Sequence, residues 1–282
     1  MLAVGGQKGK NLPMGGILFQ KSAKLIVFSL TAALLLYTSG CGDDRTVTVS
    51  QPEGLENAMP RIYDTSPEST GQLLRDTSAT VRNNSETNMG VHFVMDSRTT
   101  IGDTTIVSKG EGDMVFPDRV RMTTQNYTDA QSIPVEVIVI SGKAYTRSAT
   151  TNGMWKSSGT GVSAPDPRSI ISLFDFARSS RNFGEESLSG NRKTYHMQLD
   201  VDATLAADEA KKQNSDPALM QALEATRNAS VTVDLWIGTS DLLIYQERVV
   251  ISNPATALKS EQTFIFSGWG KSVEIVKPCE SC

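Results

Sequence analysis

The chain has 282 residues and a formal net charge of −4 at pH 7, from 27 Lys and Arg against 31 Asp and Glu. Residues 1–40 contain four Lys and no acid, so the remainder carries 23 basic and 31 acidic side chains, a charge of −8. That balance excludes an electrostatic case for nucleic-acid binding, which requires clustered Lys and Arg. With only two histidines in the sequence, His92 and His196, metal and acid–base chemistry has few groups to use.

An apolar segment near the N-terminus has the order of an export signal. Lys21 and Lys24 precede the apolar run 25–37, and small residues 38–40 lead to Cys41. The run is shorter than the roughly 20 residues that span a bilayer. We therefore predict that residues 1–40 form a signal peptide, whose true start could be Met14.

The end of this segment resembles a bacterial lipoprotein signal, with Thr38 at the position where such signals usually have Leu. The resemblance implies that Cys41 is lipidated, with palmitate for example, and anchors the chain to the extracytoplasmic face of the cell membrane. Plain secretion and an uncleaved anchor remain as alternatives.

Two segments of different composition follow the cysteine. Residues 41–66 are polar and have few large apolar side chains, so they cannot bury enough surface to fold and are predicted to be a disordered tether. Residues 67–84 carry Leu73, Leu74 and Val81 at helical spacing, which predicts an amphipathic helix.

From residue 90 the apolar period changes to two, which is typical of strands. We expect strands at 90–95, 104–116 (interrupted at 109–112), 119–125, 135–140, 144–149, 154–158, 182–188, 193–205, 231–237, 242–252 and 260–267. Helices are expected at 167–178 and, in a polar region, at 206–227. This order predicts an α+β fold with a large antiparallel sheet and its helices gathered on one face.

The sequence lacks the motifs of nucleophilic, zinc-dependent and nucleotide-dependent enzymes. We therefore predict that the chain is not an enzyme and has no catalytic residue, metal ligand or cofactor. His196 falls on the polar phase of its strand and is interpreted as a solvated sheet residue. Cys279 and Cys282 form a terminal C-x-x-C with no helix after it, so residues 279–282 are interpreted as a tail whose thiols could close a disulfide.

The helix expected at 167–178 is apolar over more than half of its circumference. Its large apolar side chains include Ile170, Ile171, Leu173 and Phe174. Either these residues fill a core, or the sheet and its helices leave a cavity for an apolar ligand. Periodicity does not separate the two possibilities.

Five segments carry a family resemblance: GEGDMVFPDRVRM (110–122), VIVISGKAYTR (138–147), GMWKSS (153–158), VTVDLWIGTSDLLIYQERV (231–249) and GWGKSVEIVKP (268–278). Together they resemble the LppX/LprA/LprF/LprG lipoproteins and the wider LolA-like fold, over most of residues 67–278. The resemblance implies a strongly curved antiparallel sheet, a half-barrel covered by helices around an apolar cavity.

The resemblance also implies a function. Such a protein binds the acyl chains of a lipid or lipoglycan and carries it in the cell envelope, with a membrane transporter as a further candidate partner. Ile170, Ile171, Leu173 and Phe174 are then the candidates for the cavity lining. The alternative is a sensor or scaffold domain of the same fold that binds a protein partner in the envelope.

Overall fold

The computed structural model describes residues 62–85, 87, 89–128, 131–141, 143–159, 171, 173–213, 224 and 226–279, and the structural statements below concern these residues. The predicted signal peptide, Cys41 and Cys282 lie outside this part of the chain. None of the helices in the described ranges has both the length and the hydropathy needed to cross a membrane.

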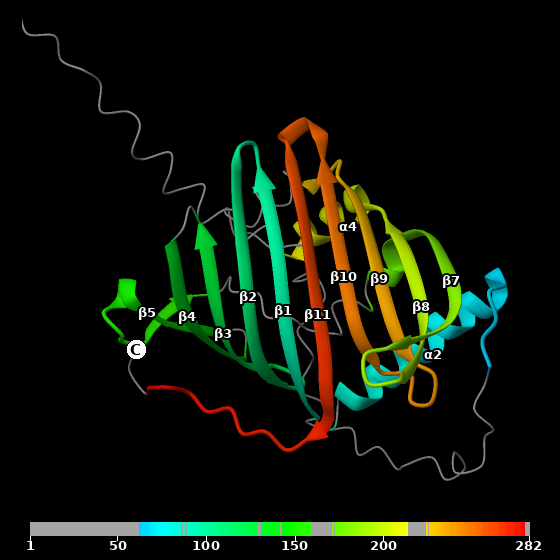
Figure 1. Ribbon diagram of the computed structural model, residues 1–282, viewed down its shortest axis with the longest axis horizontal. Helices are drawn as coiled ribbons and strands as arrows, with labels where there is room; N and C mark the ends of the chain where they lie inside the picture. Colours follow the sequence, from blue (N-terminus) through cyan, green and yellow to red (C-terminus); the bar gives the residue numbers. More distant parts are fainter. Residues whose placement is uncertain are drawn as a thin grey trace, which may run out of the picture.

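One antiparallel sheet of eleven strands forms the body of the protein (Figure 1). Its spatial order is β6-β5-β4-β3-β2-β1-β11-β10-β9-β8-β7, and it is open because the edge strands β6 and β7 do not pair with each other. The strands are β1 Gly90–Ile101, β2 Thr104–Val115, β3 Arg119–Thr128, β4 Gln131–Ile140, β5 Lys143–Ser148, β6 Lys156–Gly159, β7 Ala177–Leu188, β8 Arg192–Val201, β9 Ser230–Gly238, β10 Ile244–Asn253 and β11 Leu258–Lys271.

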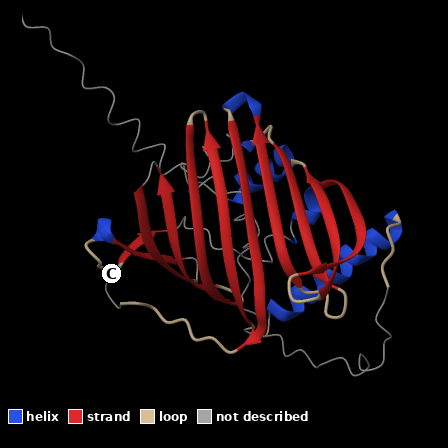
Figure 2. Cartoon of the chain, viewed as in Figure 1, coloured by secondary structure: helices blue, strands red, loops and turns tan. Residues whose placement is uncertain are grey.

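Two α-helices lie on the same side of this sheet, α2 Pro67–Ser85 and α4 Ala203–Gln213 (Figures 1 and 2). Short 3-10 turns occur at Ala149–Thr151, Phe174–Phe176 and Pro254–Thr256. The predicted α+β class is confirmed: an open, curved antiparallel sheet carries its helices on one face.

Alternation along the strands produces one covered face, which we call the inner face: the side of the sheet that bears Phe93, Leu235 and Phe264. A single hydrophobic cluster joins these residues to the buried sides of α2 and α4. The helices contribute through residues such as Leu73 and Ala207, which are at most 1% exposed. The opposite side of the sheet is the outer face.

The ordered domain begins earlier than the predicted boundary at residue 67. Tyr63 is 5% exposed, its ring meets that of Tyr195 at 5.5 Å, and its hydroxyl donates to Asp76 Oδ2 at 2.6 Å. Tyr63, which falls in the predicted tether, therefore packs on the domain, and the Asp64 carbonyl accepts a hydrogen bond from Asn182. The contacts of Tyr63 with Tyr195 and Asp76 hold it on the domain, although the residues around it are mostly polar.

Several predicted element boundaries were wrong. Strand β2 runs through the interruption expected at 109–112, the helix expected to reach residue 178 ends at Phe176, and the strand expected to reach residue 205 ends at Val201. In the last case Asp202 Oδ1 accepts a hydrogen bond from the Leu205 amide at 2.9 Å. An aspartate in that position caps a helix, so α4 begins where the apolar alternation still favours a strand.

Gly112 explains why β2 continues through its glycines. A Cβ at this position would lie 2.3 Å from the carbonyl oxygen of Arg121 on β3, which is closer than real Cβ atoms approach other heavy atoms. The glycine therefore lets the backbones of β2 and β3 come close together on the inner face. It shapes the strand and does not end it.

Candidate functional site

The inner face is the largest set of apolar side chains that the fold brings together. Phe93 and Phe264 lie edge to face with ring centroids 6.3 Å apart, and Phe264 stacks on Phe266 at 6.1 Å. Strands β4 to β1 and β11 to β8 all contribute. The buried apolar members are Val91, Phe93, Met95, Met114, Val120, Met122, Val137, Tyr195, Met197, Leu199, Val201, Val231, Val233, Leu235, Ile237, Ile244, Val249, Ile251, Leu258, Phe264 and Phe266.

Three of the four predicted cavity residues join this cluster. Ile171 and Leu173 are 3% and 1% exposed, and Phe174 is half-buried against the same side chains. Ile170 lies outside the described residues. The segment thus covers the inner face, while its role as the wall of a ligand cavity stays a prediction.

Of the two cysteines in the predicted pair, Cys279 lies within the described residues and Cys282 does not. Cys279 is disulfide-bonded and packs beside Ile275, in a small cluster of its own with Tyr145. Cys282 is outside the described residues, so its pairing with Cys279 stays a prediction. The lipidation site Cys41 is outside them as well.

A row of polar side chains interrupts the apolar inner face. Asn126, Ser108, Ser97 and Gln262 are successive cross-strand partners on β3, β2, β1 and β11. Gln262 Nε2 donates to the sulfur of Met95 at 3.3 Å, and Asn126 Oδ1 is buried with no hydrogen-bond partner in the described part of the chain. A thioether is a weak acceptor, so this row has unused hydrogen-bonding capacity.

Glu247 is the one acidic residue that the fold buries in this face within the described ranges. It stands opposite Leu235 on β9 and Phe264 on β11 and is 1% exposed. Its Oε1 has no hydrogen-bond partner among the described residues. Burial raises the pKa of this carboxyl to about 8, so the group is mainly neutral at pH 7.

Sequence reasoning missed Glu247 and the polar row, although one signal was present. In the strand predicted at 242–252, Glu247 shares its phase with Val249 and Ile251. A carboxylate on the apolar phase of a strand conflicts with the pattern around it. Such conflicts mark functional or strained positions.

The outer face holds a second cluster, around His196. The imidazole stacks on Trp236 with centroids 4.5 Å apart, and Nε2 lies 3.2 Å from Asp234 Oδ1. Trp236 Nε1 donates to Glu186. His196 is therefore on the predicted face, but it is packed and partnered; the interpretation as a solvated residue was wrong because Trp236 and Phe183 flank the ring. Within the described ranges, no three His, Cys, Asp or Glu side chains are placed to hold a metal ion.

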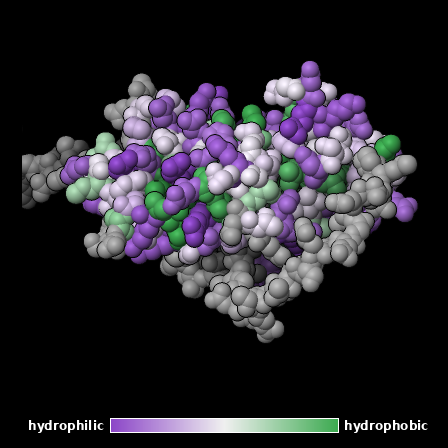
Figure 3. All heavy atoms as spheres, turned by 90° about the horizontal axis from the view of Figure 1, so that it is seen from below, coloured by the Kyte–Doolittle hydropathy of each residue, from purple (hydrophilic) through white to green (hydrophobic). Residues whose placement is uncertain are grey.

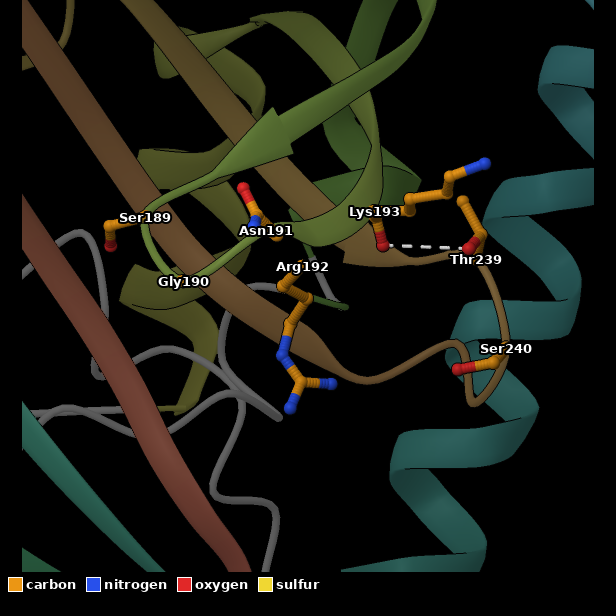
Figure 4. Close-up of a pocket in the computed structure, with 7 residues that line it drawn as sticks. All are labelled: Ser189, Gly190, Asn191, Arg192, Lys193, Thr239 and Ser240. Carbon is orange, nitrogen blue, oxygen red and sulfur yellow. Dashed lines mark hydrogen bonds between the residues drawn. The ribbon is translucent and has the colours of Figure 1, made fainter.

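A polar hollow of about 620 Å³ lies between the turns β7–β8 and β9–β10. Arg192 and Lys193 extend in different directions from it, and Thr239 Oγ1 donates to the Lys193 carbonyl at 3.5 Å (Figure 4). Its lining consists of Ser189, Gly190, Asn191, Arg192, Lys193, Thr239 and Ser240. Because these residues are polar, the hollow does not suit an acyl chain.

The surface seen from below is mainly hydrophilic, with hydrophobic residues in separate patches (Figure 3). Val94 and Ile265, cross-strand partners on the outer face, are 44% and 47% exposed, and an exposed apolar pair of this size is ordinary for a folded domain. The inner face, with Glu247 and the polar row, is therefore the candidate site.

Comparison with solved structures gives matches at low sequence identity. LprF from Mycobacterium bovis aligns over 77% of this chain and 99% of its own, with 17% identity and a TM-score of 0.49. The MucA/MucB complex of Pseudomonas aeruginosa aligns over 71% and 59%, with 13% identity and a TM-score of 0.35. A LolA superfamily protein from Nitrosomonas europaea aligns over 70% and 94%, with 8% identity and a TM-score of 0.24.

LprF and the LolA superfamily are the groups that the five sequence segments resemble. No protein-family model and no curated protein sequence matches the chain.

Proposed function

We propose that this protein is a membrane-anchored extracytoplasmic lipoprotein that binds acyl chains of a lipid or lipoglycan against its inner face and carries the lipid in the cell envelope. The observation that carries the proposal is that face: an open sheet presents buried apolar side chains from eight of its strands to one side. The export signal and the five resembling segments support the location and the class of ligand.

The affinity would come from shielding methylenes from water. Each buried methylene contributes about 0.8 kcal/mol, so about ten of them supply roughly 8 kcal/mol, the free energy of a micromolar complex. Part of this gain is offset by the entropy that the ligand and the protein lose on binding. A chain of ordinary lipid length therefore suffices without any charged contact.

An acyl chain can reach the inner face only if a segment of the protein that covers this face moves. We infer that the segment with Ile171, Leu173 and Phe174 is the cover, because it joins the cluster through side chains and lies between two strands of the sheet in sequence. A carrier of this kind binds and releases its ligand unchanged, so we infer a binding protein and not an enzyme.

Mass spectrometry of the protein extracted from membranes tests both parts of the proposal. Under native conditions we expect a non-covalently bound lipid, and under denaturing conditions a chain that begins at Cys41 and carries covalent lipid. The Cys41→Ala variant should lose the covalent mass but still bind lipid when lipid is supplied. A protein that retains only a stoichiometric protein partner and no lipid would contradict the carrier function and favour the sensor or scaffold.

A further inference from the structure

Among the described residues, Glu247 has no hydrogen-bond partner that accounts for its burial. Both of its direct cross-strand neighbours, Leu235 and Phe264, are hydrocarbon, and its Oε1 accepts no hydrogen bond from the described residues. An unpartnered buried polar group destabilises a folded protein, so a leucine would serve a purely structural position better. A purely structural role therefore does not explain why this position holds a carboxyl.

The charged groups closest to Glu247 along the sheet lie on the other face. Arg248 follows it in sequence but points outward, where its Nε donates to Glu261 at 2.9 Å and its Nη1 lies 3.9 Å from Asp234. On the inner face, the flanking positions of β9, β10 and β11 are Val233, Ile237, Val249, Gln262 and Phe266. No cation among the described residues faces Glu247, so this site does not suit an anionic head group.

A second polar side chain stands at the diagonal position. Gln262 pairs with Val249, two residues along β10 from Glu247, and diagonal neighbours lie roughly 7–8 Å apart. One ligand group between them can contact both. Within the part of the chain that the structure describes, the Gln262 amide donates to the Met95 sulfur alone, and Asn126 Oδ1 at the far end of the polar row has no partner.

We propose that Glu247 and Gln262 bind a hydroxyl group on the buried part of the lipid, so that the preferred ligand is a hydroxylated acyl chain. The carboxyl accepts the hydroxyl hydrogen and the amide donates to the hydroxyl oxygen, so Glu247 Oε1 gains the partner that it lacks. The raised pKa agrees with this, because a neutral carboxyl can donate as well as accept. The inference rests on the proposed function and adds a class of ligand to it.

Competition binding tests the inference. The delipidated mature protein is loaded with a fluorescent fatty acyl probe, which is displaced by stearate or by monohydroxystearates that differ in the position of the hydroxyl. We expect at least one hydroxystearate to bind about tenfold more tightly than stearate. A site built to bind a hydroxyl discriminates against a ligand that lacks it.

Three variants assign the preference to the carboxyl. Glu247→Leu should abolish the preference and leave stearate affinity equal or higher, whereas Glu247→Gln should retain most of it because the amide can still accept and donate. Glu261→Gln, on the outer face, is the matched control and should bind like the wild type. A thermal unfolding transition for each variant checks that it is folded.

The outcomes separate the two levels of the proposal. If stearate and all hydroxystearates bind the wild type equally, the hydroxyl site is wrong while the carrier function stands. A preference that persists in Glu247→Leu also overturns the assignment. If no acyl chain displaces or binds, the proposed function itself fails.

Discussion

Glu247 links the stability of the folded protein to pH. Its pKa is about 8 in the folded state and near 4.5 in the unfolded chain. Below pH 4.5 both states hold the proton; between 4.5 and 8 the unfolded chain releases it while the folded protein retains it. The folded state is therefore weakened as pH rises through this window, by up to about 1.4 kcal/mol per pH unit.

Substitution of Glu247 by Gln should remove this dependence. The difference in free energy of unfolding, variant minus wild type, should increase by about 3 kcal/mol between pH 5 and pH 7.5. The reason is that the carboxyl of the wild type ionises on unfolding in this range, whereas an amide does not. Chemical denaturation of delipidated protein at the two pH values measures the difference, and contributions of all other groups cancel. Parallel pH profiles for the two proteins would show that the carboxyl is ionised or solvated in the folded state.

The sequence predicted the apolar residues of the inner face, but it did not predict the polar residues buried beside them. Phe93, Leu235 and Phe264 follow from alternation alone, because strands of period two place them on one side. Glu247 and Gln262 occupy the same phase, but how deeply they are buried depends on strands and helices remote in sequence. Burial and missing partners are properties of the assembled sheet.

Among the elements, β2 shows how a glycine pattern misleads. Gly110 and Gly112 predict an interruption, since glycine weakens strands, yet both lie within a continuous strand. Gly112 is required because β3 approaches it closely, and this approach is a tertiary contact that the local sequence does not reveal. By contrast α2 was predictable because its buried residues Leu73, Thr77 and Val81 recur at helical spacing within the element itself.

Gly112→Ala should destabilise the protein by about 1–3 kcal/mol, because the new Cβ would overlap the Arg121 carbonyl oxygen and push β2 and β3 apart. The matched control is Gly71→Ala in α2, where the added Cβ meets only the flexible end of Arg75 at 3.4 Å. That substitution should stabilise the helix by roughly 0.5–1 kcal/mol. Thermal unfolding compares the two; equal effects would mean that β2 and β3 do not need a glycine at position 112 for their close approach.

For the whole molecule, local signals predicted hairpins but not the order of the sheet. The adjacent pairs from β1 to β5 follow from short turns. The pairing of β1 with β11 joins residues far apart in the sequence, such as Thr99 and Ser260, whose hydroxyls are 2.7 Å apart across 161 positions. That pairing joins the two halves into one inner face, so the site could be expected only through the family resemblance.

Equilibrium titration of the delipidated protein with a fluorescent fatty acyl probe tests whether the inner face binds an acyl chain. We predict saturable binding at one probe per chain with a micromolar or lower Kd. Val249→Phe, which adds volume to the inner face, should weaken binding, whereas Val94→Phe on the outer face should not. If folded protein leaves the probe fluorescence unchanged over this range, the inner face does not bind an acyl chain.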